Sequence, residues 1–247
     1  MTGSEDSETF EVAGSATLPG LAITGMGGGR EAVLAAAMLA ATLAASGENV
    51  AAMVPVETGI DDPCDPGSAG ALMRWAAGHM DDPRQVTPFA LEADRSAMHA
   101  ADASGTLLHS AAFDRAREAL SDGRSVFVMV DAIGLLDPIT PSLTTLDLIV
   151  RWKLSAAIAA PINRWTIGNV RILYSLLLSR NIRIAGVILS AETSQDPDDL
   201  EGADAVRDTL AALLNCPVVV APTMASEHDR AELVAAGRAC GVLRLAP

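Results

Sequence analysis

A short glycine-rich segment near the start of the chain combines residue types that could bind phosphate. Residues 25–29 read Gly-Met-Gly-Gly-Gly, between an apolar segment and an alanine-rich one. The backbone N–H groups of such a turn at the start of a helix can approach a phosphate closely. The usual loop for this purpose, G-x-x-x-x-G-K-[ST], is one residue longer and ends in Lys and a hydroxyl residue, where this chain has Arg30 and Glu31. The segment predicts the backbone of a phosphate site without its usual side chains.

The same glycines allow two other interpretations. Residues 27–32 fit the form G-x-G-x-x-A, which binds the pyrophosphate of a dinucleotide, and Glu57 stands where such proteins place an acid for the ribose. Short matches of this kind are common by chance in sequence rich in glycine and alanine. The remaining interpretation is a tight turn between a strand and a helix that binds no ligand. The residues alone leave the three interpretations open.

Carboxylates that could hold a metal ion follow two apolar segments. Asp131 comes directly after the strand predicted over residues 125–130, where a nucleotide hydrolase places a metal-binding acid. Asp62 belongs to an acidic loop over residues 61–66. Carboxylate oxygens suit Mg²⁺, so both residues are candidate metal ligands. The structural alternatives are a capping role for Asp131 and a solvated acidic loop around Asp62.

Positive charge for a phosphate is scarce in this chain. Its single lysine, Lys153, precedes a predicted strand and should lie at the strand's N-terminal end, away from the edge where ligands bind. Arg30 is the candidate replacement, although a planar guanidinium does not fill the place of an ammonium group. Thr58, shortly after the second predicted strand, offers a hydroxyl group at the ligand edge.

The composition limits the class of protein that carries these residues. Half of the 247 residues are hydrophobic and only 3% are aromatic, which favours parallel strands covered by alanine-rich helices. The net charge of −14 argues against binding to nucleic acids. We recognise no membrane span and no signal peptide. Three widely spaced cysteines show no metal pattern and fit a reducing cytoplasm.

Apolar segments and helical segments alternate along the chain, which predicts a doubly wound, mostly parallel α/β sheet with helices on both faces. We expect a disordered acidic tail over residues 1–18 and a single domain over residues 19–247. Residues 80–104 look irregular or partly helical. The expected strands are 20–24, 49–56, 125–130, 156–160, 183–190, 217–221 and 242–245, and the expected helices are 30–46, 68–79, 108–121, about 146–150, 167–179, 204–213 and 228–237.

In order and spacing, the loops that follow these strands resemble those of dethiobiotin synthetase, a P-loop ligase of biotin synthesis. The similarity spans residues 19–245 and lies in collinear spacing, since no single motif is intact. Thr24-Gly25 matches the family's Thr-Gly before the P-loop, residues 54–59 match its Lys-Pro-Val-x-[ST]-Gly segment, and residues 130–135 match its Val-Glu-Gly-Ala-Gly-Gly segment. Residues 144–148 match the family's Thr-x-x-Asp-Leu, and residues 165–169 match its Gly-Thr-Ile-Asn-His. Residues 185–187 match its Ala-Gly-Val strand, and Pro222 lies where the nucleotide-base loop would be.

The resemblance implies that ATP and Mg²⁺ drive carboxylation of a diamine and closure of a ureido ring, in a homodimer with the substrate at its interface. Two lysines that stabilise negative charge in the family are replaced here by Arg30 and Val54. The metal-binding Glu corresponds to Asp131, and an Asn that recognises adenine corresponds to Ser190. The nucleotide-binding residues implied by the resemblance are Gly25, Gly27, Gly28, Gly29, Ser190 and Pro222.

Three functions therefore remain open. The first is a diverged ligase-like enzyme with Arg30 and Thr58 as catalytic residues and with Asp131 and Asp62 as metal ligands. The second is a catalytically inactive relative that serves as a binding or regulatory subunit. The third is a dinucleotide binder. An arginine that reaches the anion site above the glycine turn would favour the first function, and a turn filled by Met26 or Glu31 would favour the second.

Overall fold

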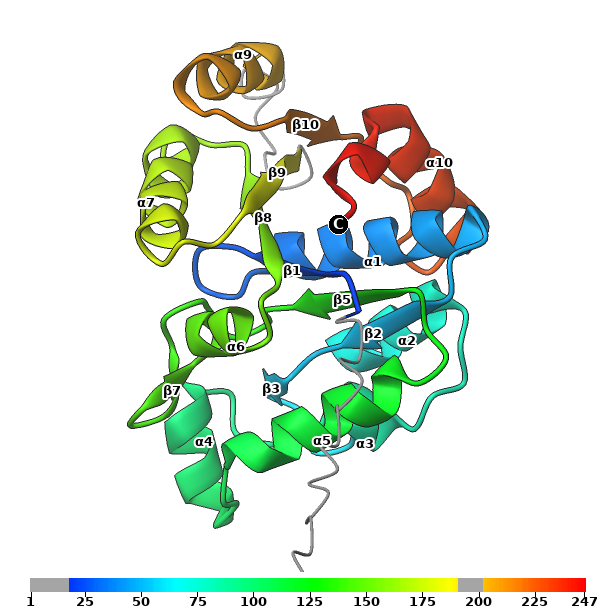
Figure 1. The fold of residues 1–247 in the computed structure, drawn as a ribbon, viewed down its shortest axis with the longest axis vertical. Coiled ribbons are helices and arrows are strands. Elements are labelled where there is room, and N and C mark those ends of the chain that lie inside the picture. The colour runs from blue at the N-terminus through cyan, green and yellow to red at the C-terminus, as the bar shows by residue number, and fades with distance from the viewer. Residues whose placement is uncertain (1–17, 191–201) are drawn as a thin grey trace, which may run out of the picture.

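The computed structural model describes residues 18–190 and 202–247. The centre of this part is a six-stranded parallel sheet in the order β10-β9-β8-β1-β5-β2 (Figure 1). This confirms the predicted doubly wound parallel sheet. The strands of the sheet are β1 (Gly20–Thr24), β2 (Val50–Met53), β5 (Val126–Val130), β8 (Ser155–Pro161), β9 (Ile184–Ser190) and β10 (Val218–Ala221).

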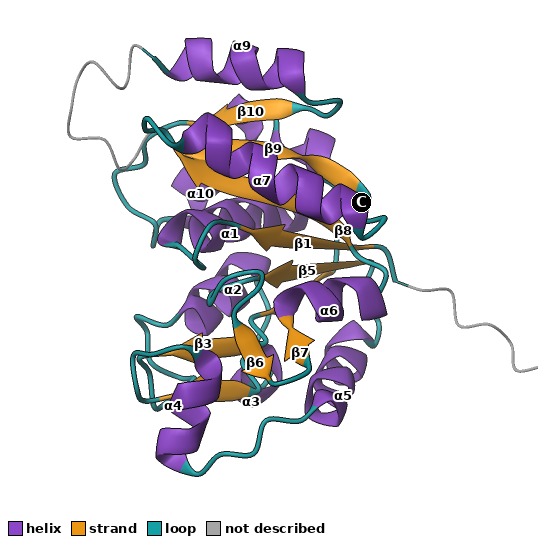
Figure 2. Cartoon of the chain, turned by 90° about the vertical axis from the view of Figure 1, so that its left-hand side faces the viewer, coloured by secondary structure: helices purple, strands orange, loops and turns teal. Residues whose placement is uncertain are grey.

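Helices cover both faces of this sheet. The helices α1 (Arg30–Ala45), α2 (Ala69–Ala77) and α10 (Arg230–Cys240) pack on one face, and α5 (Ser110–Ser121), α6 (Thr145–Arg151), α7 (Thr166–Ser179) and α9 (Ala203–Leu213) pack on the other. Figure 2 shows α6 and α7 on the near side of the sheet and α1 on its far side. Both faces are covered, so successive strand residues such as Leu21 and Ala22 are all buried and the strands read as continuous apolar runs.

The strand order places the ligand edge beside β1. The chain passes from β1 to one side of the sheet for β2 and β5, then crosses to the other side for β8, β9 and β10. In open parallel sheets, ligands bind at the carboxyl ends of the strands where the order reverses in this way. The glycine-rich turn after β1 and the loop after β5 both lie at this place.

Short elements surround the lower half of the sheet in Figure 1. The strands β3 (Val56–Thr58) and β4 (Phe89–Leu91) form a parallel pair, and β6 (Pro138–Thr140) and β7 (Leu143–Thr144) form an antiparallel pair. The helices α3 (Pro83–Val86) and α4 (Ala97–Ser104) lie in the region predicted as irregular or partly helical. The chain ends in a 3₁₀ helix, η1 (Val242–Leu245).

Two predicted strands differ from the structure. The strand predicted over residues 49–56 is wrong in extent, because β2 ends at Met53 and the chain leaves the sheet at Pro55, which has no N–H to donate. The N–H of Val54 instead donates to the carbonyl of Val86 at 2.8 Å. The strand predicted over residues 242–245 is also wrong. Its two buried residues, Val242 and Leu245, are three apart, which suits one turn of the observed 3₁₀ helix.

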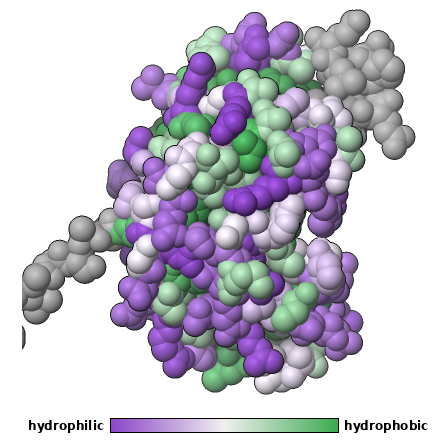
Figure 3. Space-filling model, turned by 90° about the vertical axis from the view of Figure 1, so that its right-hand side faces the viewer, coloured by the Kyte–Doolittle hydropathy of each residue, from purple (hydrophilic) through white to green (hydrophobic). Residues whose placement is uncertain are grey.

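Other expectations concern the surface and the tail. Leu18, the last residue of the predicted tail, is half-buried, and residues 1–17 lie outside the described part of the chain. Within the described ranges, no helix combines the length and apolar character that crossing a bilayer requires. The face of the molecule in Figure 3 is mainly polar, with small apolar groups scattered over it.

Candidate functional site

Loops after β1, β3, β5 and β10 meet at the ligand edge and enclose an open cavity of about 250 Å³. The structure brings Gly28, Arg30 and Thr58, three of the predicted site residues, to the wall of this cavity. Glu227 of the loop between β10 and α10 and the start of α2 complete the wall. One arginine, Arg30, and two glutamates, Glu57 and Glu227, therefore surround this cavity.

The glycine turn is covered by the loop that follows β5. Gly27 and Gly28 have φ angles of +78° and +65°, which side chains rarely adopt. A methyl group added at Gly28 would lie 2.5 Å from backbone atoms of Ala132 and Ile133, and one added at Gly134 would lie 3.4 Å from the Cα of Gly27. Backbone from the β5–α6 loop thus packs directly against Gly28.

Charged side chains beside the turn are engaged within the protein. The Arg30 guanidinium forms an ion pair with Glu227, with 2.5 Å between Nη2 and Oε2. The carboxylate of Glu31 folds back against Gly29, so that a methyl group added at Gly29 would collide with it. Glu31, one of the two residues named as fillers of the turn, therefore lies against the glycines, while Arg30 points to a carboxylate.

Asp131 is fully buried and all of its described contacts are internal. Its carboxylate accepts hydrogen bonds from the hydroxyl of Thr24 at 2.7 Å, the N–H of Gly134 at 2.9 Å and the hydroxyl of Thr145 at 3.3 Å. A longer contact of 3.4 Å joins it to the N–H of Ile133. Burial raises the pKa of Asp131, and these hydrogen bonds act in the opposite direction. The carboxylate ties β1, β5 and the start of α6 together.

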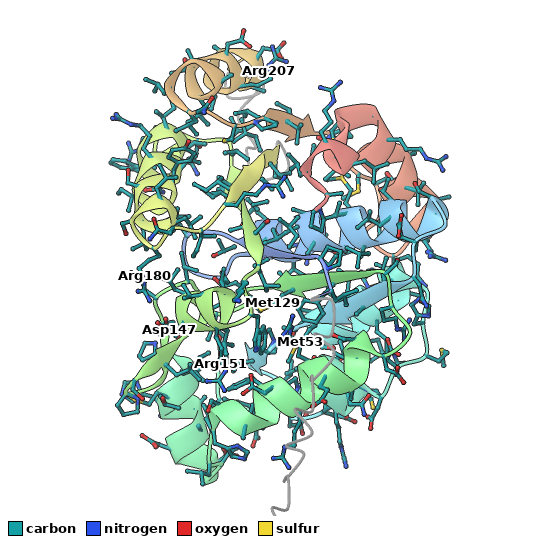
Figure 4. All side chains as sticks on the ribbon, viewed as in Figure 1. Met53, Met129, Asp147, Arg151, Arg180 and Arg207 are labelled. Carbon is teal, nitrogen blue, oxygen red and sulfur yellow. The ribbon has the colours of Figure 1, made fainter. Side chains whose placement is uncertain are left out.

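The start of α6 holds Thr145 in place. Thr144 caps the helix in a reciprocal capping box with Asp147, in which the Thr144 N–H donates to Asp147 at 2.9 Å. Asp147 also accepts a hydrogen bond from Arg180, at the end of α7, at 3.1 Å, and Figure 4 shows the two side chains beside each other. The Asp131 network is thereby connected to the helix layer on this face of the sheet.

Glu57 caps the helix α2. Its two carboxylate oxygens accept hydrogen bonds from the N–H groups of Ala69, at 2.5 Å, and Gly70, at 3.1 Å, while the Ser68 hydroxyl accepts one from Ala71. Burial raises the pKa of Glu57, and the two backbone hydrogen bonds lower it. A negative group at a helix N-terminus is stabilised by the orphan N–H groups and the helix dipole. The anion position at the start of α2 is therefore filled by the chain itself.

The remaining predicted residues lie apart from this cavity. Ser190 and Pro222 come together, with Glu31, around a separate space of about 20 Å³, which is close to the volume that one water molecule needs. Asp62 is in an exposed loop and accepts a hydrogen bond from the N–H of Cys64 at 2.9 Å. Of the His, Cys, Asp and Glu side chains in the described part, no three are grouped so that they could hold a metal ion.

These residues do not fit a magnesium–nucleotide complex held in the manner of a P-loop. The backbone of residues 132–134 packs against Gly28, and the cation that would meet the phosphates is paired with Glu227. Asp131 would have to give up hydrogen bonds to Thr24 and Gly134 before it could coordinate an ion.

Three residues of this site were not predicted from the sequence as site residues. Thr24 immediately precedes the glycine turn and Thr145 follows a second threonine, so their hydroxyls could have been suspected as partners of Asp131. Glu227 carries no local signal, because its relation to Arg30 depends on how the loop after β10 crosses to α1.

The parallel sheet and the glycine-rich turn between β1 and α1 define the class of protein, a P-loop α/β protein. A family model described as an AAA domain matches residues 21–226, and the chain belongs to this family, which includes dethiobiotin synthetase. This confirms the resemblance found in the sequence. The family implies nucleotide binding.

Two individual proteins are similar to this chain. The ATP-dependent dethiobiotin synthetase BioD of Anaeromyxobacter dehalogenans (strain 2CP-C) is 26% identical over 179 residues, which cover 72% of this chain and 78% of that protein. The structure of chloroplast FtsY from Physcomitrella patens is similar over 90% of this chain and 66% of its own, with 16% identity and a TM-score of 0.47.

Proposed function

We propose that this chain is a dethiobiotin synthetase homologue that has lost ATP-dependent carboxylation and ring closure and acts as a binding or regulatory subunit. The observation that carries the proposal is the β5–α6 loop, which lies on Gly28 while Asp131 points inward to Thr24 and Gly134. A working P-loop needs an acid that is open to a metal-bound nucleotide and a cation that is free to meet its phosphates.

The missing lysines support the same proposal. Removing one group that stabilises a developing negative charge typically costs about 10²- to 10³-fold in rate. Val54, at the position of the second lysine in the resemblance, is fully buried and apolar. Arg30, at the position of the first, is paired with Glu227. With both contributions lost or engaged, little turnover is expected.

The alternatives draw on fewer observations. An active ligase that uses ATP and Mg²⁺ would rely on Arg30 and Thr58, which do share one cavity, and on Asp131 and Asp62, which have no described contact with each other. A dinucleotide binder would need Glu57 free to accept hydrogen bonds from a ribose, but both oxygens of its carboxylate are engaged at the start of α2.

Titration calorimetry with Mg–ATP tests the proposal. We expect no binding heat up to millimolar Mg–ATP, for either the natural chain or Arg30→Ala, and no ring product from diamine and bicarbonate. The Anaeromyxobacter enzyme, assayed in parallel, shows that the assay detects the reaction. Micromolar binding by the natural chain that is lost in Arg30→Ala would contradict the proposal, because Arg30 would then have taken over the role of the lysine.

We also propose a homodimer that forms through the side of α7 that carries Ile172. Ile172 and Trp165, which directly precedes the helix, are seven residues apart and so lie on one side of it, where they expose 60% and 61% of their surface. Large exposed apolar side chains on one side of an element are typical of an interface. We expect Ile172→Glu to convert the dimer to a monomer in light scattering after size exclusion. The control is Leu107→Glu, at a leucine outside α7 that is 79% exposed. A natural chain that is already monomeric would contradict this proposal.

The proposed location is the cytoplasm. The three cysteines, Cys64, Cys216 and Cys240, are all unpaired, and burial raises the pKa of the last two. Thiols of this kind suit a reducing compartment.

A further inference from the structure

The ion pair between Arg30 and Glu227 joins two distant parts of the chain at the candidate site. Arg30 is the first residue of α1, directly after the glycine turn, and its side chain is 67% exposed. Glu227 belongs to the loop between β10 and α10, and its side chain is only 19% exposed. The carboxylate is therefore the less exposed partner of the pair, and the loop places it against a guanidinium that is otherwise accessible.

The loop that carries Glu227 is held on both sides. The carboxylate of Glu232, in the first turn of α10, accepts hydrogen bonds from the N–H groups of Ala225 and Ser226. Asp229 caps α10 through the N–H of Ala231 at 2.9 Å. The ring of His228 lies 6.5 Å from that of Trp75 in α2. Glu227 is thus positioned by an ordered segment, unlike a carboxylate on a free surface chain.

The charges around the cavity make the position of Glu227 important. Arg30 is the one permanent cation among the described residues that line the 250 Å³ cavity, in a chain of net charge −14. Glu227 engages its guanidinium and adds a negative charge in the place that an anionic ligand would take. An incoming phosphate must therefore displace one carboxylate and tolerate its repulsion.

We propose that Glu227 is an internal counter-ion that shields Arg30 from phosphate groups, an autoinhibitory contact built into the loop between β10 and α10. The inference rests on the proposed function, because it explains why the remaining cation of the P-loop region would not bind a nucleotide. When the carboxylate is neutralised or the loop moves away, Arg30 and the cavity beside it form a weak anion site.

The test is the affinity for inorganic pyrophosphate, without metal and at low ionic strength, of the variant Glu227→Gln. We expect its affinity to be about tenfold higher than that of the natural chain, from loss of the ion pair and of the like-charge repulsion. Glu118→Gln is the matched control, since it changes the net charge equally on the exposed surface of α5. The double variant Glu227→Gln/Arg30→Ala should lose the gain.

The outcomes separate this inference from the proposed function. If Glu227→Gln binds pyrophosphate no more tightly than Glu118→Gln, the counter-ion role is wrong, while absent Mg–ATP binding in the natural chain still supports the proposed function. If the gain persists in the double variant, the anion binds elsewhere and the inference is overturned. Micromolar Mg–ATP binding by the natural chain would contradict the proposed function, and the Glu118→Gln comparison would still decide the role of Glu227.

Discussion

Replacing Gly28 with alanine is expected to destabilise the protein by about 3 kcal/mol, whereas the same change at Gly27 should cost about 1 kcal/mol. Both glycines have positive φ, so alanine is strained at either position. At Gly27 the new methyl group meets nothing within 4 Å. At Gly28 it meets the backbone of Ala132 and Ile133 at 2.5 Å, and backbone atoms cannot move aside as a flexible side chain would.

Urea unfolding of the two variants measures this difference directly. The midpoints and slopes give the free energies of unfolding, and an unchanged slope shows that the unfolded states are comparable. The two variants are well matched, because both replace a glycine of positive φ with alanine in the same turn. Only at Gly28 does the new methyl group meet the β5–α6 loop. Equal losses at Gly27 and Gly28 would mean that the β5–α6 loop stands clear of Gly28, and one support for the proposed function would be gone.

Asp131→Ala is expected to cost about 3 to 4 kcal/mol of stability, because it removes the acceptor of a buried hydrogen-bonded network. The hydroxyls of Thr24 and Thr145 and the N–H of Gly134 would lose their partner, and Thr24 is completely buried. Asp61→Ala, in the exposed acidic loop, is the control and should change stability by less than about 0.5 kcal/mol.

Asp131→Asn separates a structural role from a metal-binding role. Asparagine keeps an acceptor oxygen for Gly134, and its NH₂ group can donate to the hydroxyl oxygen of Thr24, so most of the stability should remain. Addition of millimolar Mg²⁺ should leave the unfolding of the natural chain unchanged. A clear increase in its stability with Mg²⁺, absent in Asp131→Asn, would show that the carboxylate does bind the metal.

The pH dependence of stability provides a further readout of the same variant. Burial raises the pKa of Asp131 above its usual range, so the charged form is disfavoured in the folded state. The folded protein therefore binds this proton more tightly than the unfolded chain does. The resulting stabilisation is complete at pH values below the pKa of Asp131 in the unfolded chain. It is lost as the pH rises through the pKa of Asp131 in the folded protein. In Asp131→Asn this loss should be absent, so the two unfolding free energies should diverge in this pH window.

Much of the architecture could be predicted from sequence because it depends on local patterns. Continuous apolar runs such as residues 126–130 indicated strands buried on both faces, and their alternation with helices indicated a parallel sheet. The exceptions have physical reasons. Pro55 ends β2 early because it cannot donate a hydrogen bond to a neighbouring strand, and η1 is apolar like a strand but has the spacing of a 3₁₀ turn.

The amino-acid sequence by itself determined which chemical groups the site has: a glycine turn, Arg30 in place of lysine, Glu31, and Asp131 after a central strand. Only the tertiary structure decided where these groups point. The carboxylate of Asp131 could face a metal or Thr24, and residues 132–134 could stand away from the turn or lie on it. Such choices depend on packing between segments far apart in the chain, as does the approach of Glu227 to Arg30, and no local pattern of residues encodes them.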